Sequence, residues 1–376
     1  MERFERLIYD CVRDRFSDVH ITGCHPVVSR KHGFINFDRE NTWSHEEVDA
    51  LTKKLLNARQ MKIFKDRWSV DLGLSVSHVR LRMNVFNTTR GISIAIRILP
   101  GCVPNIASLN LHPSIQDISQ VRSGLVLVCG STGSGKSTTM AAVIDEINAN
   151  RASHIITLED PIEYRFISRK SFVEQRELGT HIPSFEQGLL DVLREDPDVI
   201  LVGELREPET IRLALNAAES GHLVIASLHA SNFEDAIYRI LNAFPHEAKQ
   251  AIHHQLAATL SWLIVQRLEY ITRLGFRVPQ LSILRGTPAV RSIIREDKLA
   301  QLESAVQTAR GDGMFTMDGY MKYYIEKLTS FTSPFEIFTP SLEPESEVVY
   351  QSPLAGSMPA YTEFPDGVIG RTGLAS

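Results

Sequence analysis

A glycine-rich segment carries the clearest chemical signal in this chain of 376 residues. The segment "GSTGSGKST" fits the phosphate-binding pattern GxxxxGK[ST], with an apolar strand pattern before it and a helical pattern after it. Its glycines allow backbone N–H groups to curl around phosphate oxygens, Lys136 can reach the β- and γ-phosphates, and the Ser137 hydroxyl can ligate Mg²⁺. The predicted nucleotide-binding residues are Gly130, Ser131, Thr132, Gly133, Ser134, Gly135, Lys136, Ser137 and Thr138.

Three other apolar segments end in ionisable side chains. "HIITLEDPIEY" reaches Glu159, with Glu163 just beyond it, "DVILVGE" ends at Glu204, and "HLVIASLH" ends at His229. Continuous apolar runs of this length are typical of buried strands in a parallel sheet. Ligands of such sheets bind outside the carboxyl ends of the strands. If these strands run parallel to the one before the glycine loop, their terminal side chains gather around the γ-phosphate.

Glu204 is predicted to polarise the water that attacks the γ-phosphate. P-loop enzymes usually carry an aspartate directly before such a glutamate, and this aspartate holds Mg²⁺ through water. In this chain the residue before Glu204 is Gly203. We therefore expect Mg²⁺ to depend on Ser137, phosphate oxygens and water, with help from Glu159 or Glu163.

Each of these carboxylates also has a purely structural interpretation. Glu204 precedes the helical pattern "PETIRLALNAAES", where a negative charge favours the helix N-terminus. Glu159 and Glu163 could instead form ion pairs with Arg165 or Arg169. The sequence leaves both interpretations open.

Two histidines flank the last of these strands. His222 and His229 are seven residues apart, roughly 23 Å along an extended strand. They cannot both contact one γ-phosphate. His229 is the better candidate sensor, and His222 remains a candidate with a subunit contact or a hydrogen-bonded buried imidazole as alternatives.

Residues 1–98 predict a small α/β domain with an antiparallel sheet. Apolar residues from Phe4 to Val12 have helical spacing, and Ser44 with Glu47 forms a capping box for a second helix. "DVHI" and "GFINF" are expected as short strands. Period-two alternation over residues 70–98 predicts further strands, with "NTTRG" as a hairpin turn. The alternation puts Arg80, Arg82 and Arg97 on the face opposite the core.

Composition divides the rest of the chain. The Pro- and Gly-containing "LPGCVPN" predicts a linker, assigned to residues 99–111. Apolar strands alternating with helices over residues 112–330 predict a mostly parallel sheet. Residues 331–376 contain six prolines, six acidic residues and one basic residue. We expect that last segment to be a flexible acidic tail.

Composition also restricts the class of protein. The sequence contains no run of 18 apolar residues, which argues against a membrane span, and "MERFERLIYD" lacks the apolar core of a secretory signal. Cys11, Cys24, Cys102 and Cys129 form no CxxC pair, which argues against a zinc ribbon and favours a reducing cytoplasm. The net charge of −5 equals that of the acidic tail. A nearly neutral body argues against a nucleic-acid partner.

The motifs together resemble the secretion-type hexameric ATPases, and within them the PilT-like pilus retraction motors. They occur in family order over about residues 3–328. The matching segments are "GSTGSGKST", "LEDPIEY", "QRELG", "LREDPDVILVGELR", "AESGHLVIASLHASN", "AVRSIIRE" and "GMFTMD". Extension and type II secretion motors of the superfamily typically run longer and carry a four-cysteine zinc motif, which this chain lacks.

The resemblance implies a PAS-like N-terminal domain, a RecA-like C-terminal ATPase domain, and a homo-hexamer with ATP between neighbouring units. It also implies arginines of the N-terminal domain that reach the nucleotide. "VRLRMNVF" and "AIRIL" match these positions and select Arg82 and Arg97. The alternative interpretation is that both are ordinary solvated arginines of a sheet.

The leading hypothesis is an ATP- and Mg²⁺-dependent hexameric motor for type IV pilus retraction, cytoplasmic and peripheral to the inner membrane. ATP binding would close a neighbour's N-terminal domain onto the site, with a hinge in the linker, and the rotation would act on an inner-membrane platform protein. Other pilus ATPases are possible partners. Alternatives are an accessory paralogue, a secretion-system assembly ATPase, a RecA-like nucleic-acid translocase, or a regulatory ring subunit with poor hydrolysis.

Overall fold

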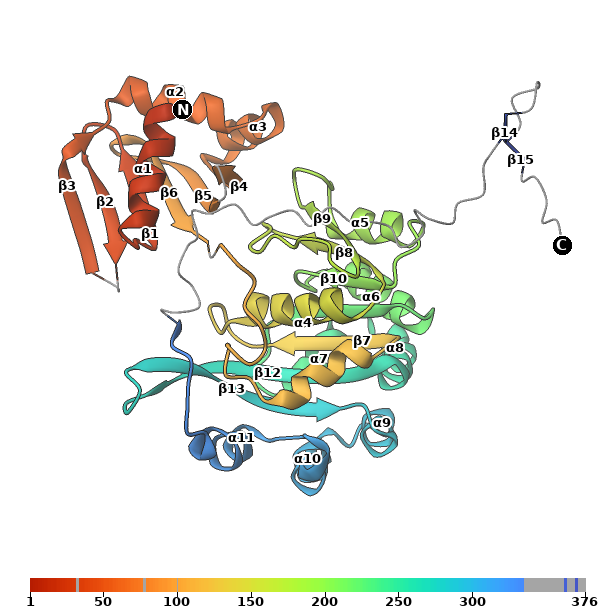
Figure 1. Cartoon of the computed structure of the whole chain (residues 1–376). Coiled ribbons are helices and arrows are strands. Elements are labelled where there is room, and N and C mark those ends of the chain that lie inside the picture. Colours follow the sequence, from red (N-terminus) through yellow and green to blue (C-terminus); the bar gives the residue numbers. More distant parts are fainter. Residues whose placement is uncertain (32–33, 77–78, 100, 335–361, 364–368, 371–376) are drawn as a thin grey trace.

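The computed structural model describes residues 1–31, 34–76, 79–99, 101–334, 362–363 and 369–370. It contains a six-stranded sheet near the N-terminus and a seven-stranded sheet in the larger, later part of the chain (Figure 1). Most of the predicted acidic tail lies outside the described residues. Its described pieces include a short antiparallel pair, β14 (Thr362–Glu363) and β15 (Ile369–Gly370).

The N-terminal sheet has the strand order β3-β2-β1-β6-β5-β4, and all its neighbouring strands are antiparallel. Its strands are β1 (Asp18–Thr22), β2 (Pro26–Lys31), β3 (Phe34–Thr42), β4 (Ser69–Val76), β5 (Val79–Thr88) and β6 (Gly91–Ile98). Its helices are α1 (Glu2–Arg13), α2 (His45–Leu55) and α3 (Ala58–Arg67). The antiparallel alternation predicted over residues 70–98 is confirmed, including the tight connection between β5 and β6.

The local helix signals in this part were informative. The predicted capping box at Ser44 forms in both directions with Glu47. The five apolar residues of α1 that share helical spacing are all buried against the sheet. Strand β2 and helix α3 were not predicted.

The larger sheet has the order β13-β12-β7-β11-β10-β8-β9. All neighbouring pairs are parallel except β12 with β13, so the predicted mostly parallel sheet is confirmed. The strands are β7 (Gly124–Cys129), β8 (His154–Glu159), β9 (Phe172–Glu177), β10 (Val199–Val202), β11 (Leu223–Leu228), β12 (Leu260–Ile271) and β13 (Phe276–Arg285). Because six of them are parallel, their carboxyl ends lie along one edge.

Helices cover both faces of this sheet. Helix α4 (Lys136–Asn150), the 3₁₀ segment η1 (Pro113–Gln120) and α11 (Met317–Tyr323) share one apolar core with the sheet. The other core includes α5 (Phe185–Val192), α6 (Pro208–Glu219), α7 (Phe233–Asn242), α8 (His246–Thr259), α9 (Pro288–Arg295) and α10 (Leu302–Thr308). Three short 3₁₀ segments complete the described elements: η2 (Leu299–Gln301), η3 (Arg310–Asp312) and η4 (Ile325–Lys327). Central strands such as β7 are buried along their whole length.

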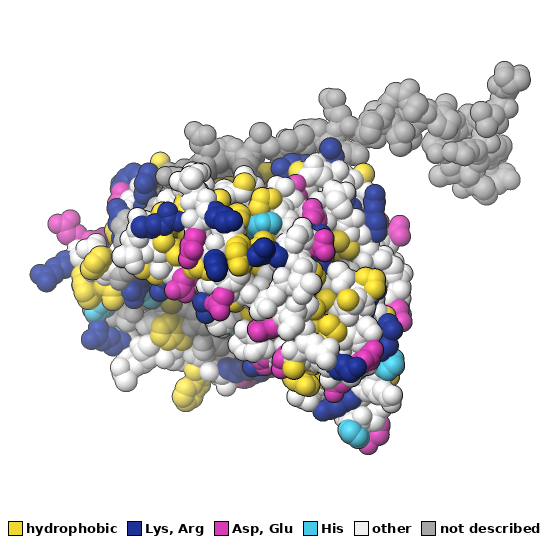
Figure 2. Space-filling model, turned by 90° about the horizontal axis from the view of Figure 1, so that it is seen from below, with side chains coloured by type: hydrophobic (Ala, Val, Ile, Leu, Met, Phe, Trp, Pro, Cys, Tyr) yellow, Lys and Arg dark blue, Asp and Glu magenta, His cyan; other side chains and the backbone are white. Residues whose placement is uncertain are grey.

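Two observations concern possible contacts of the chain, one with a membrane and one with other molecules at its surface. Within the described ranges, no helix combines the length and the apolar character needed to cross a membrane. Figure 2 shows one face on which acidic and basic side chains are interspersed with apolar ones.

The start of the predicted tail lies against the body, since the Thr332 backbone exchanges two hydrogen bonds of 2.9 Å with the Asn110 side chain.

Candidate active site

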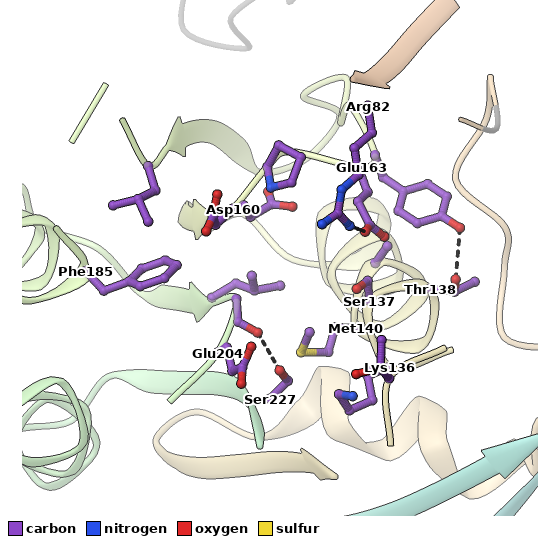
Figure 3. A pocket seen from close by; sticks show the side chains of 18 of the residues that line it. Arg82, Lys136, Ser137, Thr138, Met140, Asp160, Glu163, Phe185, Glu204 and Ser227 are labelled. Carbon is purple, nitrogen blue, oxygen red and sulfur yellow. Dashed lines mark hydrogen bonds and ion pairs between the residues drawn. The ribbon is translucent and has the colours of Figure 1, made fainter. Parts of the chain in front are cut away.

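A cleft of about 860 Å³ lies at the carboxyl ends of β8, β10 and β11, next to the glycine loop and beneath the N-terminal sheet (Figure 3). It brings together residues that the sequence analysis selected from separate segments. Those that line it are Arg82, Arg97, Thr132, Gly133, Gly135, Lys136, Ser137, Thr138, Glu159, Glu163, Glu204 and His229.

The glycine loop connects β7 to α4, whose first residue is Lys136. Gly130, Gly133 and Gly135 have φ values of 149°, 76° and 88°, a region that side chains disfavour. Lys136 Nζ donates to the carbonyl oxygens of Gly130 and Ser131, each at 2.9 Å, and burial lowers the pKa of this lysine. The loop therefore presents a positive charge and a helix N-terminus to the cleft.

Three loop residues do not line this cleft. Gly130 and Ser131 line a smaller pocket of about 320 Å³. Ser134 is buried with 3% exposure. Its carbonyl oxygen accepts a hydrogen bond of 2.7 Å from Gln266 Nε2 of β12, and Gln266 Oε1 accepts one of 2.7 Å from Thr139.

Glu204 stands just past β10, facing the cleft (Figure 3). Its carboxylate accepts a hydrogen bond of 2.7 Å from Arg206 and lies 3.3 Å from His229 Nε2. Burial raises the pKa of Glu204, but the Arg206 hydrogen bond and the nearby charges of Arg206, His229 and Lys136 outweigh it and leave that pKa below its usual value. Glu204 is therefore an anion at neutral pH.

Glu159 ends β8 and differs from Glu204 in its surroundings. Burial raises the pKa of Glu159 to about 7, although hydrogen bonds from Thr157 at 2.7 Å and Gln175 at 3.0 Å favour its ionised form. The cleft thus holds two strand-end carboxylates with opposite pKa shifts.

The backbone of Gly203, directly before Glu204, lies close to the end of β8. A Cβ atom there would lie 3.2 Å from the Leu158 carbonyl oxygen and 3.4 Å from Glu159 Cα. The Gly203 N–H donates to that same oxygen at 2.7 Å. This close approach between β10 and β8 leaves little room for an aspartate.

Arg82 and Arg97 lie on neighbouring strands β5 and β6 and both reach the cleft. Arg82 points toward Glu163, at 3.4 Å (Figure 3), and Arg97 Nε donates to Asp18 at 2.9 Å. Both arginines line the cleft of their own chain. The expectation that a neighbouring subunit's N-terminal domain closes onto the site through Arg82 and Arg97 concerns the ring and stays a prediction.

His222 does not belong to the cleft. It precedes β11, whereas His229 follows that strand, and its Nδ1 lies 3.0 Å from the Ala217 carbonyl oxygen. The strand separates the two histidines along the sheet. The structure thus corrects the inclusion of His222 among the candidate catalytic residues.

Several residues at the cleft were missed by the sequence analysis. Arg206 lines it, and the Tyr164 hydroxyl lies 3.0 Å from Thr138 Oγ1. Arg206 directly follows the strand-end motif in "GELR", which was a usable signal. Gln266 is a lone amide in the apolar run "LIVQRL", and that isolation was also a signal.

The chain matches the family model described as "Type II/IV secretion system protein" over residues 5–297. It is 43% identical over 302 residues to a "Twitching motility protein" of Neisseria gonorrhoeae, covering 80% of each chain. It is 42% identical to the "Type IV pilus retractation ATPase PilT" of Pseudomonas aeruginosa, covering 83% of this chain and 90% of that one.

A solved structure is also similar over most of both chains. "Crystal Structure of the Pilus Retraction Motor PilT and Bound ADP" superposes with a TM-score of 0.79 and 36% identity, covering 88% of this chain and 96% of the other. The predicted fold class, an N-terminal α/β domain followed by a RecA-like ATPase domain, is confirmed by this match together with the two observed sheets.

Proposed function

Because the chain belongs to the type II/IV secretion system protein family, we propose that its cleft hydrolyses ATP to drive pilus retraction. The predicted resemblance to PilT-like retraction ATPases is confirmed, and so is the predicted enzyme class of ATPase. The proposal depends mainly on one observation, the meeting of side chains from separate segments at one site. Cationic, anionic and hydroxyl groups from β5, the glycine loop, β8, β10 and β11 meet in one cleft.

The proposed roles follow from charge and position. Lys136 and the backbone N–H groups at the start of α4 bind the β- and γ-phosphates. Glu204 orients and polarises the attacking water, and its lowered pKa keeps it ready to accept a hydrogen bond. His229, beside Glu204, senses the terminal phosphate. Arg82 and Arg97 stabilise charge on the transferred phosphoryl group.

Mg²⁺ fits the oxygen donors of this cleft. The Ser137 hydroxyl and the Glu163 and Glu159 carboxylates line it together, and hard oxygen ligands are those that Mg²⁺ prefers. Bound Mg²⁺ would neutralise phosphate charge and orient the nucleotide. In the described part of the chain, no group of three or more His, Cys, Asp or Glu side chains could hold a metal ion. Ser137 is assigned as the direct protein ligand because its hydroxyl occupies the position of the phosphate-binding motif that ligates Mg²⁺.

Coupling to force requires an assembly. We propose a ring of six chains in which residues 1–98 and 112–330 act as two domains joined by residues 99–111. ATP binding closes the two domains around the cleft, and hydrolysis releases them. The rotation acts on an inner-membrane platform protein, which keeps the motor at the cytoplasmic side of that membrane.

The proposal is tested by Glu204→Gln, which keeps the side-chain shape and removes the charge. ATP should bind with an affinity within about threefold of wild type, while kcat falls on the order of 100-fold or more, the range of a lost general base. Glu209→Gln on α6, where the Glu209 side chain is 44% exposed and lies outside the cleft, is the matched control and should leave kcat unchanged. Near-normal hydrolysis by the Glu204→Gln chain would remove Glu204 from the mechanism.

The direction of force is tested in cells. Deletion of the gene should produce excess surface pili and abolish surface motility if the motor retracts. Bald cells would indicate an assembly ATPase, and an unchanged pilus count with reduced motility would indicate an accessory paralogue.

A further inference from the structure

We propose that Arg80 and Glu177 form a latch that holds the N-terminal sheet closed over the nucleotide cleft. We use latch for the junction of Arg80, Ile162 and Glu177. The inference rests on the proposed ATPase function. It assigns the two charged residues as positioning residues, which act on the nucleotide through Arg82 and through the loop from Glu159 to Phe166, called the acidic loop.

The latch joins three segments that are distant in sequence. Arg80 of β5 donates through Nη2 to Glu177 Oε2 of β9, and through Nε to the Ile162 carbonyl oxygen at 3.0 Å. The same Glu177 oxygen accepts the Ile162 N–H at 3.1 Å. Both backbone polar groups of Ile162 are therefore held, one from each side.

Burial distinguishes this pair from the other ion pair between the same regions. The side chains of Arg80 and Glu177 are 15% and 5% exposed, whereas those of Arg82 and Glu163 are 42% and 28% exposed. Exposed pairs contribute little because water screens them, while removing one partner of a buried pair leaves an uncompensated charge. The hold between the two regions therefore depends on Arg80 more than on Arg82.

Gly73 provides the space that the latch occupies. A Cβ atom at this position of β4 would lie 2.2 Å from Arg80 Nη2 and 2.7 Å from Glu177 Oε2. Any other residue would push the guanidinium and the carboxylate aside. Three residues from three strands thus share one compact junction.

Strand β9 connects the latch to the chemistry of the cleft. Gln175 and Glu177 are two residues apart and face the loop that runs from Glu159 to Phe166. Gln175 Nε2 donates to Glu159 at 3.0 Å and to the Tyr164 carbonyl oxygen at 2.8 Å. Within the segment "QRELG", Gln175 therefore holds the acidic loop and Glu177 holds the N-terminal sheet.

The register of β5 then sets the position of Arg82. Arg80 and Arg82 lie on the same face of the strand, and they contact the adjacent residues Ile162 and Glu163. Fixing Arg80 against Ile162 therefore delivers Arg82 to Glu163 and the phosphate site. Opening the latch would withdraw Arg82 without changing the glycine loop.

The latch is tested in the full-length chain with Arg80→Met, Glu177→Gln and the double variant. Loss of either partner lowers the closed population, and the apparent affinity falls with the fraction of competent molecules. Each single variant should raise the KM for ATP by about tenfold or more, as expected for one charge-assisted hydrogen bond, and leave kcat within about threefold. The double variant should be no worse than the single ones, because both remove the same junction.

A distance measurement separates positioning from folding. Spin labels at Cys24 and at a Thr308→Cys site, in a Cys102→Ser chain diluted with unlabelled copies, report the separation of the two regions. Without nucleotide, the latch variants should give a broader and longer distance distribution than wild type. Lys53→Met, which removes an exposed ion pair with Asp49 on α2, is the matched control and should change neither KM nor distance.

Unchanged KM and unchanged distances in both single variants would overturn the latch, as would additive effects in the double variant. A thermal midpoint that falls in both single variants with normal distances would assign the pair a purely structural role and also overturn it. If the wild-type chain hydrolysed no ATP, the proposed function would fail, but the distances would still test the latch.

Discussion

Replacing Gln266 by methionine should weaken both the fold and the nucleotide site, because this amide holds two parts of the phosphate-binding motif. Its Nε2 donates to the Ser134 carbonyl oxygen of the glycine loop, and its Oε1 accepts from Thr139 of α4, both at 2.7 Å. Gln266, Ser134 and Thr139 are 2%, 3% and 1% exposed, so water cannot replace the lost bonds. Methionine has a similar length and no matching polar groups.

The magnitude follows from the groups left behind. The substitution strands one buried carbonyl oxygen and one buried hydroxyl, each worth about 1–3 kcal/mol. The free energy of unfolding should therefore fall by about 2–6 kcal/mol. Thr139→Val strands only the Gln266 oxygen and should cost about 1–3 kcal/mol. Because the double variant no longer contains the stranded hydroxyl, its cost should be smaller than the sum of the two single costs.

Urea unfolding followed by Trp262 fluorescence measures this effect in the larger sheet, in a chain with Trp43→Phe and Trp68→Phe. Gln280→Met is the matched control. Gln280 is also 2% exposed and donates to the Met317 carbonyl oxygen at 2.9 Å, but it lies on β13 away from the loop. Both variants should lose stability, and only Gln266→Met should also weaken ATP binding. A loss below about 1 kcal/mol with unchanged ATP affinity would refute the reasoning.

Two further predictions concern charges in the cleft. Glu159→Gln should remove a pH dependence of the free energy of unfolding. Burial raises the pKa of Glu159 to about 7, so the folded chain binds this proton more tightly than the unfolded chain. The wild-type chain therefore loses stability as pH rises from about 4.5 to 7. Unfolding measured across that window should show wild type losing about 1–3 kcal/mol relative to Glu159→Gln, and parallel curves would contradict the shift. Lys136→Met should raise the Kd for ATP by at least about tenfold in equilibrium binding, because it removes a charge-assisted contact to phosphate, whereas Lys170→Met, outside the cleft, should not.

The sequence predicted the parts of the site that are encoded locally. The glycine loop needs a strand before it and a helix after it, and all three appear in one stretch that ends at Asn150. The same applies to the capping box at Ser44 and to the alternation that placed Arg82 and Arg97 on one face. These features depend on residues a few positions apart, so a single sequence reveals them.

The parts that were missed depend on which strands become neighbours. The local pattern of β12 does not show that Gln266 will lie beside the glycine loop, because that contact exists only once β12 pairs with β7. His222 is a different case, because its spacing from His229 already indicated that one extended strand separates the two side chains, and the structure has β11 between them. The role of "QRELG" likewise required β9 to lie at the sheet edge facing the N-terminal domain.

Arg80 and Arg82 of β5 differ in burial, and this difference gives them different roles in the proposed mechanism. Arg82 contacts Glu163 at 3.4 Å in a solvent-exposed pair, so phosphate oxygens can compete for its guanidinium at small cost. Arg80 is buried between a carboxylate and a backbone carbonyl, and releasing it would strand the Glu177 carboxylate and the Ile162 carbonyl oxygen. Nucleotide chemistry can therefore recruit Arg82 without breaking the contact at Arg80. A larger rotation of the N-terminal sheet must break the contact at Arg80. The free energy of that contact is therefore a cost of domain rotation, and it is not a cost of recruiting Arg82 to the phosphate.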